Sequence, residues 1–271
     1  MTDLQKVERE MLCTFIAICE QLQLTYYLVC GSALGAMYYQ GFIPWDDDLD
    51  VALPRSDYQR FCREAPALLP DHYFLQTYQT DPAFPAIYAK MRDSRTTFIE
   101  TAAAHLPIHH GVYLDVFPLD GYPTERRQIR RLERHKKWLK LQLSSAYPTS
   151  SAQKFVTRCA LRVFRMLGVD KRTDRVAERL EKRISQWDLD SSPLWCNHGN
   201  WQGKLEYAPR EQYGQGREVE FEGLTVRVPS LAEEYLTQKY GNWQRDLPVE
   251  QQISHHHCLV CDTKKPYTNY I

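Results

Sequence analysis

Apolar residues recur along the chain at two periods, which predict a succession of helices and short strands. Spacings of three and four predict an amphipathic helix over residues 4–22; its apolar positions are Leu4, Val7, Met11, Phe15, Ile18, Cys19 and Leu22. A short β-prone run follows at residues 26–30 and ends at Gly31-Ser32. The next residues favour a helix that stops at Gly41, so we expect Ser32 to cap this helix and Gly31 to allow a sharp turn.

Two further predicted strands carry acidic residues. Residues 47–53 alternate, which places Asp48 and Asp50 on one face of a strand and three apolar residues on the other. Pro54 closes this strand. Residues 112–117 form a second apolar run that contains Asp115, so a third carboxylate is available from another strand.

The remaining pattern predicts helices over residues 56–69 and 231–240 and a β-hairpin from Glu218. Residues 125–143 and 158–169 are basic and amphipathic, and we expect 124–195 to be a mainly helical insertion in a single domain of residues 1–271. The basic faces are either solvated or form a surface that contacts anionic lipid or an anionic glycan.

Composition narrows the class of protein. The 34 basic and 34 acidic residues balance, so no global field favours nucleic acid as a partner. The eight cysteines are dispersed, which is typical of a reducing compartment. The first residues lack the pattern of a signal peptide, and no apolar run approaches the ~20 residues that span a bilayer. We therefore expect a cytoplasmic protein, at most peripheral at the inner face of the membrane.

The stretch DDDLD (46–50) concentrates negative charge at the start of a strand. Carboxylates held this close repel one another, and a cation relieves that repulsion. An EF-hand does not fit, because Val51 and Asp57 stand where the loop needs glycine and glutamate. A solvated capping turn is the other alternative. The Gly31-Ser32 turn, which presents backbone N–H groups to an anion, favours the metal site instead.

A Gly-Ser turn, an Asp-x-Asp strand and a third aspartate together resemble the active site of the nucleotidyltransferase superfamily. The longer string GSALGAMYYQGFIPWDDDLDVALPRSDYQRF, which begins at Gly31, resembles the signature of the LicD family, related to fukutin-related proteins. Further segments that agree are YAKMRDSRTTF (88–98), HHGVYLDVFPLDGYP (109–123), FEGLTVRVPSLAEEYLTQKYGNW (221–243) and HHH (255–257).

The resemblance implies an α/β fold with a nucleotidyltransferase-like mixed β-sheet flanked by helices, and a C-terminal mixed region. It also implies transfer of a phospho-alcohol, most often phosphocholine from CDP-choline. The acceptor would be a hydroxyl of a glycan or lipid-linked glycan precursor of the teichoic acid or lipopolysaccharide type, and CMP would be released. Phosphoryl transfer depends on charge neutralisation. We therefore expect Asp48, Asp50 and Asp115 to hold Mg²⁺ or Mn²⁺, two ions in all, and Gly31 and Ser32 to bind phosphate.

Several other residues are candidates for substrate binding. Lys90 and Arg92 match a basic pair of the family and would neutralise the diphosphate; the alternative is a pair of exposed strand charges. Trp45, with Tyr38 and Tyr113, could form an aromatic cage for a quaternary ammonium. Tyr38 stands where many family members carry a basic residue. His110 would support the metal ligands, or is a packed neutral histidine.

Three alternatives stay open at the level of sequence. One is nucleotidyl transfer, which uses the same metal geometry, and another is a non-catalytic metal-dependent glycan-binding module. The third concerns a separate site: Cys258 and Cys261 lie beside three histidines, and a structural zinc would need a second pair such as Cys196 and His198.

Overall fold

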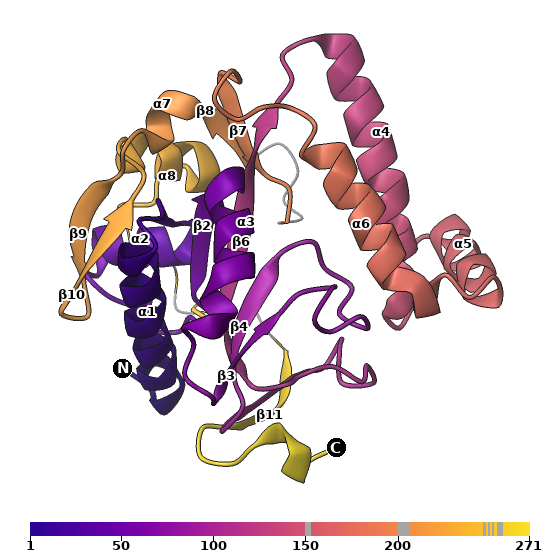
Figure 1. Cartoon of the computed structure of the whole chain (residues 1–271), viewed down its shortest axis with the longest axis horizontal. Helices are drawn as coiled ribbons and strands as arrows, with labels where there is room; N and C mark the ends of the chain where they lie inside the picture. Colours follow the sequence, from indigo (N-terminus) through magenta and orange to yellow (C-terminus); the bar gives the residue numbers. More distant parts are fainter. Residues whose placement is uncertain (150–152, 200–205, 246–247, 249, 251, 254–256) are drawn as a thin grey trace.

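A mixed β-sheet occupies the centre of the molecule (Figure 1). The computed structural model describes residues 1–271 except 150–152, 200–205, 246–247, 249, 251 and 254–256. Within the described residues the sheet has seven strands: β1 (Tyr27–Leu28), β2 (Asp50–Pro54), β3 (Tyr73–Gln76), β4 (Ala89–Asp93), β6 (Val112–Tyr122), β7 (Leu194–Asn197) and β8 (Tyr207–Pro209). The order is β1-β2-β6-β4-β3, with β7 joining β6 to β8. β2 and β6 are parallel, and the other described pairs are antiparallel.

The long central strand β6 changes partner half way along. On one side it follows β2, while on the other it pairs first with β4, through residues 112–116, and then with β7, through residues 119–122. Pro118 lies between these two ladders, where its missing N–H removes no hydrogen bond from either. β6 thus links the acidic strand β2 to the basic strand β4.

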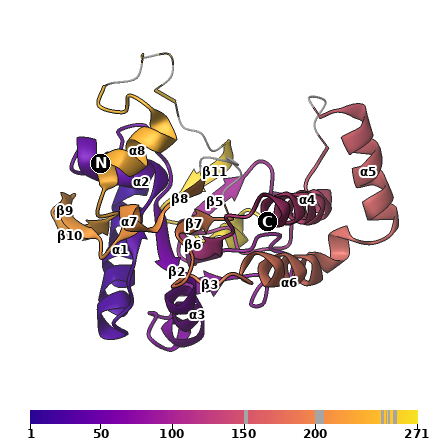
Figure 2. The ribbon, with the colours of Figure 1, turned by 90° about the horizontal axis from the view of Figure 1, so that it is seen from above.

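Helices cover both faces of the sheet, and Figure 2 shows α1 and α3 on one side and α8 on the other. The helices are α1 (Asp3–Gln21), α2 (Cys30–Tyr38), α3 (Arg55–Glu64), α4 (Arg126–Leu143), α5 (Phe155–Met166), α6 (Thr173–Ile184), α7 (Arg210–Tyr213) and α8 (Ala232–Tyr240). The described residues also form short 3₁₀ turns, which are η1 (Ala65–Ala67), η2 (Ser144–Ala146), η3 (Asp170–Arg172) and η6 (Tyr267–Asn269). Two small sheets complete the fold: β9 (Arg217–Phe221) with β10 (Leu224–Val228), and β5 (Thr97–Glu100) with β11 (Cys258–Asp262). The expected α/β fold with a mixed sheet flanked by helices is confirmed.

Local sequence explains several of these boundaries. α1 begins with a capping box, in which Thr2 Oγ1 accepts from the Gln5 N–H and Gln5 Oε1 accepts from the Thr2 N–H; such a cap contributes about 1 kcal/mol. The β9–β10 hairpin turns at Glu222-Gly223, where both residues have positive φ, as the tight turns of hairpins require. Gly241, also at positive φ, ends α8.

Among the described residues, two large apolar clusters and a smaller one around Phe84 and Ile108 stabilise the fold. The largest one fills the space between the sheet and α1, α2, α3 and α8, with fully buried residues such as Phe15, Leu53 and Leu114. A second cluster, which includes Leu132 of α4 and Leu180 of α6, packs these two helices together and against the far half of β6. None of the helices in the described part of the chain combines the length and the apolar character needed to cross a bilayer.

Candidate active site

Three charged side chains form a row across the sheet, one from each of β2, β6 and β4. Asp50 lies beside Asp115 in the parallel register, and Asp115 lies opposite Lys90 in the antiparallel one. Side chains of register partners project from the same face of a sheet. All three residues are buried, with relative exposures of 8%, 5% and 4%. The fold therefore gathers two acids and a base that are 65 residues apart in the sequence on one buried surface.

Asp115 is the centre of this row. Lys90 Nζ lies 2.9 Å from its Oδ1 and also over the ring of Tyr113, 3.2 Å from the centroid. Burial raises the pKa of Asp115, the charge of Lys90 lowers it, and the charge of Asp48 raises it again. The net direction is upward, so Lys90 compensates only part of the cost of burying this carboxylate.

Asp50 lacks such a basic neighbour in the register. Its backbone N–H donates to Ser32 Oγ at 2.8 Å, which fixes the start of β2 against α2. Burial raises the pKa of Asp50 well above its ordinary value, and the charges of Asp48, Asp115 and Asp46 raise it further. A divalent cation would relieve this repulsion directly.

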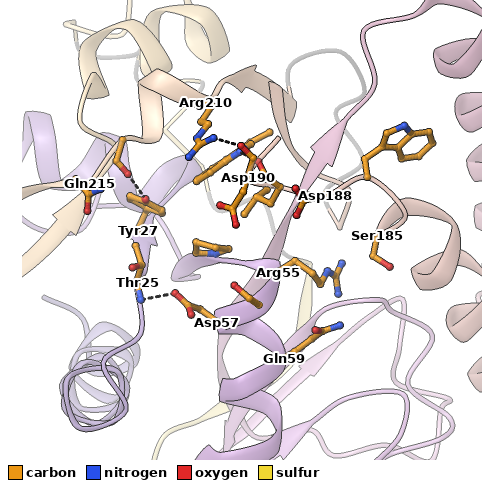
Figure 3. A pocket seen from close by; sticks show the side chains of 16 residues that line it. Thr25, Tyr27, Arg55, Asp57, Gln59, Ser185, Asp188, Asp190, Arg210 and Gln215 are labelled. Carbon is orange, nitrogen blue, oxygen red and sulfur yellow. Dashed lines mark hydrogen bonds between the residues drawn. The ribbon is translucent and has the colours of Figure 1, made fainter. Parts of the chain in front are cut away.

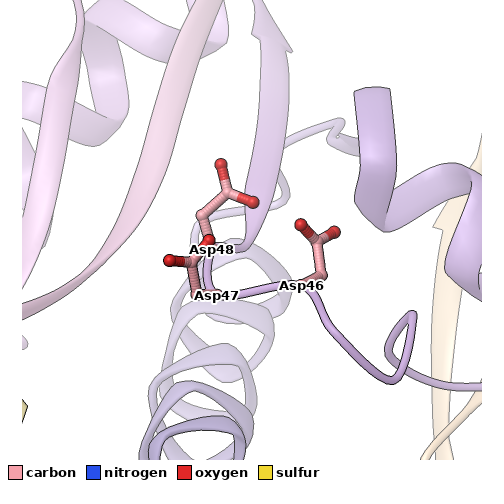
Figure 4. Close-up of side chains that lie close together, drawn as sticks. All are labelled: Asp46, Asp47 and Asp48. Atoms are coloured by element: carbon pink, nitrogen blue, oxygen red, sulfur yellow. The ribbon is translucent and has the colours of Figure 1, made fainter. Parts of the chain in front are cut away.

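The loop before β2 carries the most compact acidic group. Asp46, Asp47 and Asp48 are half-buried and place carboxylate oxygens within 4.8 Å of one another, and Figure 4 shows the carboxylates of Asp46 and Asp48 on the same side of the loop. Gln5 of α1 holds the loop in place, because its Nε2 donates to the carbonyls of Ile43 (3.2 Å) and Asp46 (3.1 Å).

The prediction that Asp48 and Asp50 share one face of a strand over residues 47–53 is wrong. β2 begins at Asp50, not at residue 47, so Asp48 lies in the loop and does not share a strand face with Asp50. Asp48 belongs to the compact group with Asp46 and Asp47, while Asp50 and Asp115 form the row on the sheet. The charge of Asp48 nevertheless acts on both Asp50 and Asp115. We therefore regard the loop and the row as one acidic site.

Glu8 of α1 is a sixth acidic residue at this site, after Asp46, Asp47, Asp48, Asp50 and Asp115, and the sequence pattern did not reveal it. It is 1% exposed, and its Oε2 has no hydrogen-bond partner. Burial raises its pKa well above the ordinary value, followed by the charges of Asp48, Asp46, Asp47 and Asp115. The available signal was its position three residues after Gln5 and four before Leu12, which are both buried; a glutamate within the inward face of a helix is unusual.

The expected Gly31-Ser32 turn is built differently. α2 begins at Cys30, after Val29, and no side chain caps it, so the prediction that Ser32 caps the helix is wrong. Cys30, not Gly31, has the positive φ of the turn. Gly31 lies against the acidic loop, and a Cβ there would come within 2.7 Å of Asp46 Oδ2, so the Asp46 carboxylate would have to shift. The first N–H groups of α2 still lie beside the acidic loop, and whether they bind phosphate stays a prediction.

Lys90 and Arg92 are both buried, so they are not a pair of exposed strand charges. Lys90 is paired with Asp115. Arg92 donates to Gln76 Oε1 and to the carbonyl of Gly111, each at 2.8 Å, and lies over the ring of Tyr113. Arg92 therefore has a structural role in joining β3, β4 and the start of β6.

The three aromatic candidates make different ring contacts. Trp45 contacts Tyr39 edge to face, and Tyr39 contacts Tyr38 in the same way. Tyr113 instead lies beneath Lys90 and Arg92. That Trp45, Tyr38 and Tyr113 form a cage for a quaternary ammonium stays a prediction.

His110 is 1% exposed, and its Nε2 lies 3.1 Å from the carbonyl of Leu106. Its ring also lies near that of Tyr267. Burial lowers its pKa. These contacts match a packed, neutral histidine, which was the alternative to a residue that supports the metal ligands.

The two pairs of candidate zinc ligands, Cys196 with His198 and Cys258 with Cys261, lie on or next to different strands. Cys196 and His198 are buried, with the sulfur 3.5 Å from Nδ1, at the end of β7. Cys258 and Cys261 belong to β11, which pairs with β5. Among the described residues, the acids of the loop form the single group of three or more ligands close enough to share a metal. His255 and His256 lie outside the described residues.

A cavity of about 460 Å³ lies at the other end of β2 (Figure 3). It is lined by polar residues that include Arg55, Asp57 and Arg210. Its buried cation, Arg55, is already paired with Asp120 (2.7 Å) and Glu181 (2.6 Å). The uncompensated charge is at the Asp50 end of the strand, and we place the functional site there.

Comparison with known proteins identifies the family of the chain. A family model described as LicD/FKTN/FKRP, nucleotidyltransferase domain, matches residues 23–160, which include the acidic loop, Lys90 and Asp115. The chain is also similar to the lipopolysaccharide cholinephosphotransferase LicD of Haemophilus influenzae. The two are 29% identical over 263 residues, which cover 92% of this chain and 95% of the relative.

Proposed function

Because the chain belongs to the LicD family, we propose that it transfers phosphocholine from CDP-choline to a hydroxyl of a cell-surface glycan precursor and releases CMP. The similarity to a lipopolysaccharide cholinephosphotransferase supports a choline-containing group and an acceptor of the lipopolysaccharide type. A teichoic acid precursor is an alternative acceptor of the same chemical class, and another CDP-alcohol is an alternative donor.

The observation that carries this proposal is the buried row of Asp50, Asp115 and Lys90 beside the acidic loop. Transfer of a phosphate ester requires neutralisation of the diphosphate and removal of a proton from the acceptor. The row offers a buried base in Asp115, and the loop offers negative charge for a cation. A structural role alone does not explain why acidic side chains are concentrated in a buried place.

The donor set fits a hard divalent cation. All candidate ligands are carboxylates, the ligands that Mg²⁺ and Mn²⁺ prefer, and Glu8 adds a buried oxygen with no protein partner. Asp50, Asp115 and the loop aspartates would hold the metal, which we propose to be two ions. When bound, the ions would neutralise the diphosphate and lower the pKa of the acceptor hydroxyl.

The protein's own residues have distinct roles in this proposal. Asp115, which lies beside the proposed metal, accepts the proton of the acceptor hydroxyl. Lys90 holds the Asp115 carboxylate in position through the 2.9 Å contact. The N-terminal N–H groups of α2, at Gly31 and Ser32, face the anionic part of the donor. Ser32 also keeps β2 in register with this helix.

Product analysis tests the proposal. Purified protein is incubated with Mg²⁺, CDP-choline and a lipid-linked glycan acceptor, and CMP and choline-modified glycan are quantified together. We expect both products in equal amounts. Release of pyrophosphate from CTP, with the nucleotide joined to the acceptor, would instead establish nucleotidyl transfer. Absence of turnover with CDP-choline, CDP-ethanolamine, CDP-glycerol and CDP-ribitol would favour a binding module.

A further inference from the structure

Helix α5 (Phe155–Met166) has two apolar faces, and only one of them packs against the protein. On the packed face, Leu161 is fully buried and Phe164 is 7% exposed, with its ring edge to face with Trp138 of α4. Arg165 Nε donates to the carbonyl of Ser145 at 2.9 Å and fixes the helix to η2. The orientation of α5 is therefore set by its own contacts.

The opposite face is exposed. The relative exposures are 70% for Phe155, 77% for Val156, 50% for Val163, 86% for Met166 and 67% for Leu167. At 100° per residue these five positions fall within an arc of about 120° and form one stripe. Soluble proteins seldom leave such a contiguous apolar surface uncovered unless it binds something.

The charged residues of α5 itself are all basic. The sequence of α5, FVTRCALRVFRM, has three arginines and no acid, and Arg158 and Arg162 fall along one edge of the stripe. The neighbouring helix α4 is also strongly basic, RRQIRRLERHKKWLKLQL. An apolar stripe bordered by basic residues is the pattern of a helix that lies in the plane of an anionic lipid surface.

We propose that α5 docks this protein on an anionic membrane surface. The apolar stripe enters the boundary between headgroups and acyl chains, while Arg158 and Arg162 contact lipid phosphates. This gives the peripheral membrane contact expected from the sequence a specific helix and a specific face. A symmetric contact between two copies would instead bring the basic α4 and α5 helices of both copies together. An anionic membrane, in contrast, buries the apolar stripe among acyl chains and neutralises the arginines with lipid phosphates.

The position of α5 is compatible with docking. In Figures 1 and 2 it lies at the outer edge of the molecule, with α4 and α6 between it and the sheet. The row of Asp50, Asp115 and Lys90 is on the sheet and does not contribute to this surface. Membrane binding can therefore occur without covering the acidic site, and it does not depend on the proposed transfer reaction.

Vesicle co-sedimentation tests this inference without turnover. The probes are vesicles of phosphatidylcholine with or without about 30% phosphatidylglycerol. We expect binding to the anionic vesicles that falls at least about tenfold in the variant Val163→Ser/Met166→Ser. In Arg158→Gln/Arg162→Gln we expect a comparable fall and a weaker dependence on salt. Leu259→Ser is the matched control, since Leu259 is 60% exposed on β11, and it should bind as the wild type does.

Two results would overturn the inference. One is anionic-vesicle binding that is absent in the wild type or unchanged in Val163→Ser/Met166→Ser. The other is a wild-type dimer in light scattering that this variant converts to a monomer, because a second copy would then cover the stripe. Both substituted residues are exposed, so thermal unfolding should show that the variant remains folded. Retained membrane binding in a protein without transferase activity would contradict the proposed function and leave this inference intact.

Discussion

Asp50 of β2 and Asp115 of β6 are direct neighbours in the parallel register of the central sheet, and both are buried. The charge of Asp115 raises the pKa of Asp50, and the charge of Asp48 raises the pKa of both residues. This buried negative charge lies at the Asp50 end of β2, beside the acidic loop and Glu8. We interpret this concentration of charge as a preformed cation site.

Asp50→Asn should separate activity from stability. We expect turnover to fall by at least about a thousandfold, because the variant loses charge at the proposed metal site. In metal-free buffer its melting temperature should equal or exceed that of the wild type, since the ionised Asp50 is destabilised by burial and by Asp48. Asp71→Asn, at an exposed turn, is the control. A variant that unfolds, or one that retains activity, would contradict the assignment.

Glu8→Gln should raise the stability of the metal-free protein and reduce the additional stability that Mg²⁺ provides. Without metal we expect a higher melting temperature, because a buried carboxylate facing other acids is removed. The increase in melting temperature on adding Mg²⁺ should be smaller than in the wild type. Thermal unfolding with and without Mg²⁺ measures both effects. If Glu8 has only a packing role, the metal-induced increase will be the same in both proteins.

Lys90→Met should be strongly destabilising. It leaves the Asp115 carboxylate buried without its cation, which typically costs about 3 kcal/mol of the free energy of unfolding. Adding Asp115→Asn to this variant should restore most of the loss, since the uncompensated charge is then gone. Urea denaturation in metal-free buffer gives both values. A double variant no more stable than Lys90→Met would show that Lys90 acts through contacts other than Asp115.

His109 should make stability depend on pH below neutrality. Burial lowers the pKa of His109 to about 3 from its ordinary 6.5, and its Nδ1 accepts from the Gly111 N–H at 3.1 Å. Between these values the unfolded chain binds the proton and the folded chain does not, so its contribution is lost as pH falls from 6.5. The slope approaches about 1.4 kcal/mol per pH unit. Urea denaturation at several pH values measures this dependence, and in His109→Asn the free energy of unfolding should fall less steeply below pH 6.5. The same pH dependence in both proteins would show that His109 is already protonated in the folded state.

Local patterns predicted much of the fold. The periodicity of α1, the β9–β10 hairpin and the stop of α8 at Gly241 all depend on neighbours in the sequence, and the structure has them. The alternation of residues 47–53 predicted a strand that begins three residues too early. Alternation describes where side chains point, whereas a strand also needs a partner, and β6 reaches β2 only from Asp50 onward.

The candidate site was predictable in part. The acidic string and Asp115 indicated a shared site, and the parallel register places Asp50 beside Asp115. Glu8 could not be found in this way, because a glutamate on an amphipathic helix normally lies on the solvent face, and only the packing of α1 on the loop buries it. The role of Ser32 was also missed, since its hydroxyl accepts from a residue 18 positions away and not from its own helix.

Crystals soaked in Mn²⁺ provide the most direct test of the acidic site, because anomalous scattering locates the metal independently of activity. We predict a peak bound by carboxylate oxygens of Asp50 and Asp115 together with the loop aspartates, and its loss in Asp50→Asn. An anomalous map with no peak at this site at saturating Mn²⁺, or with the peak unchanged in Asp50→Asn, would contradict the account.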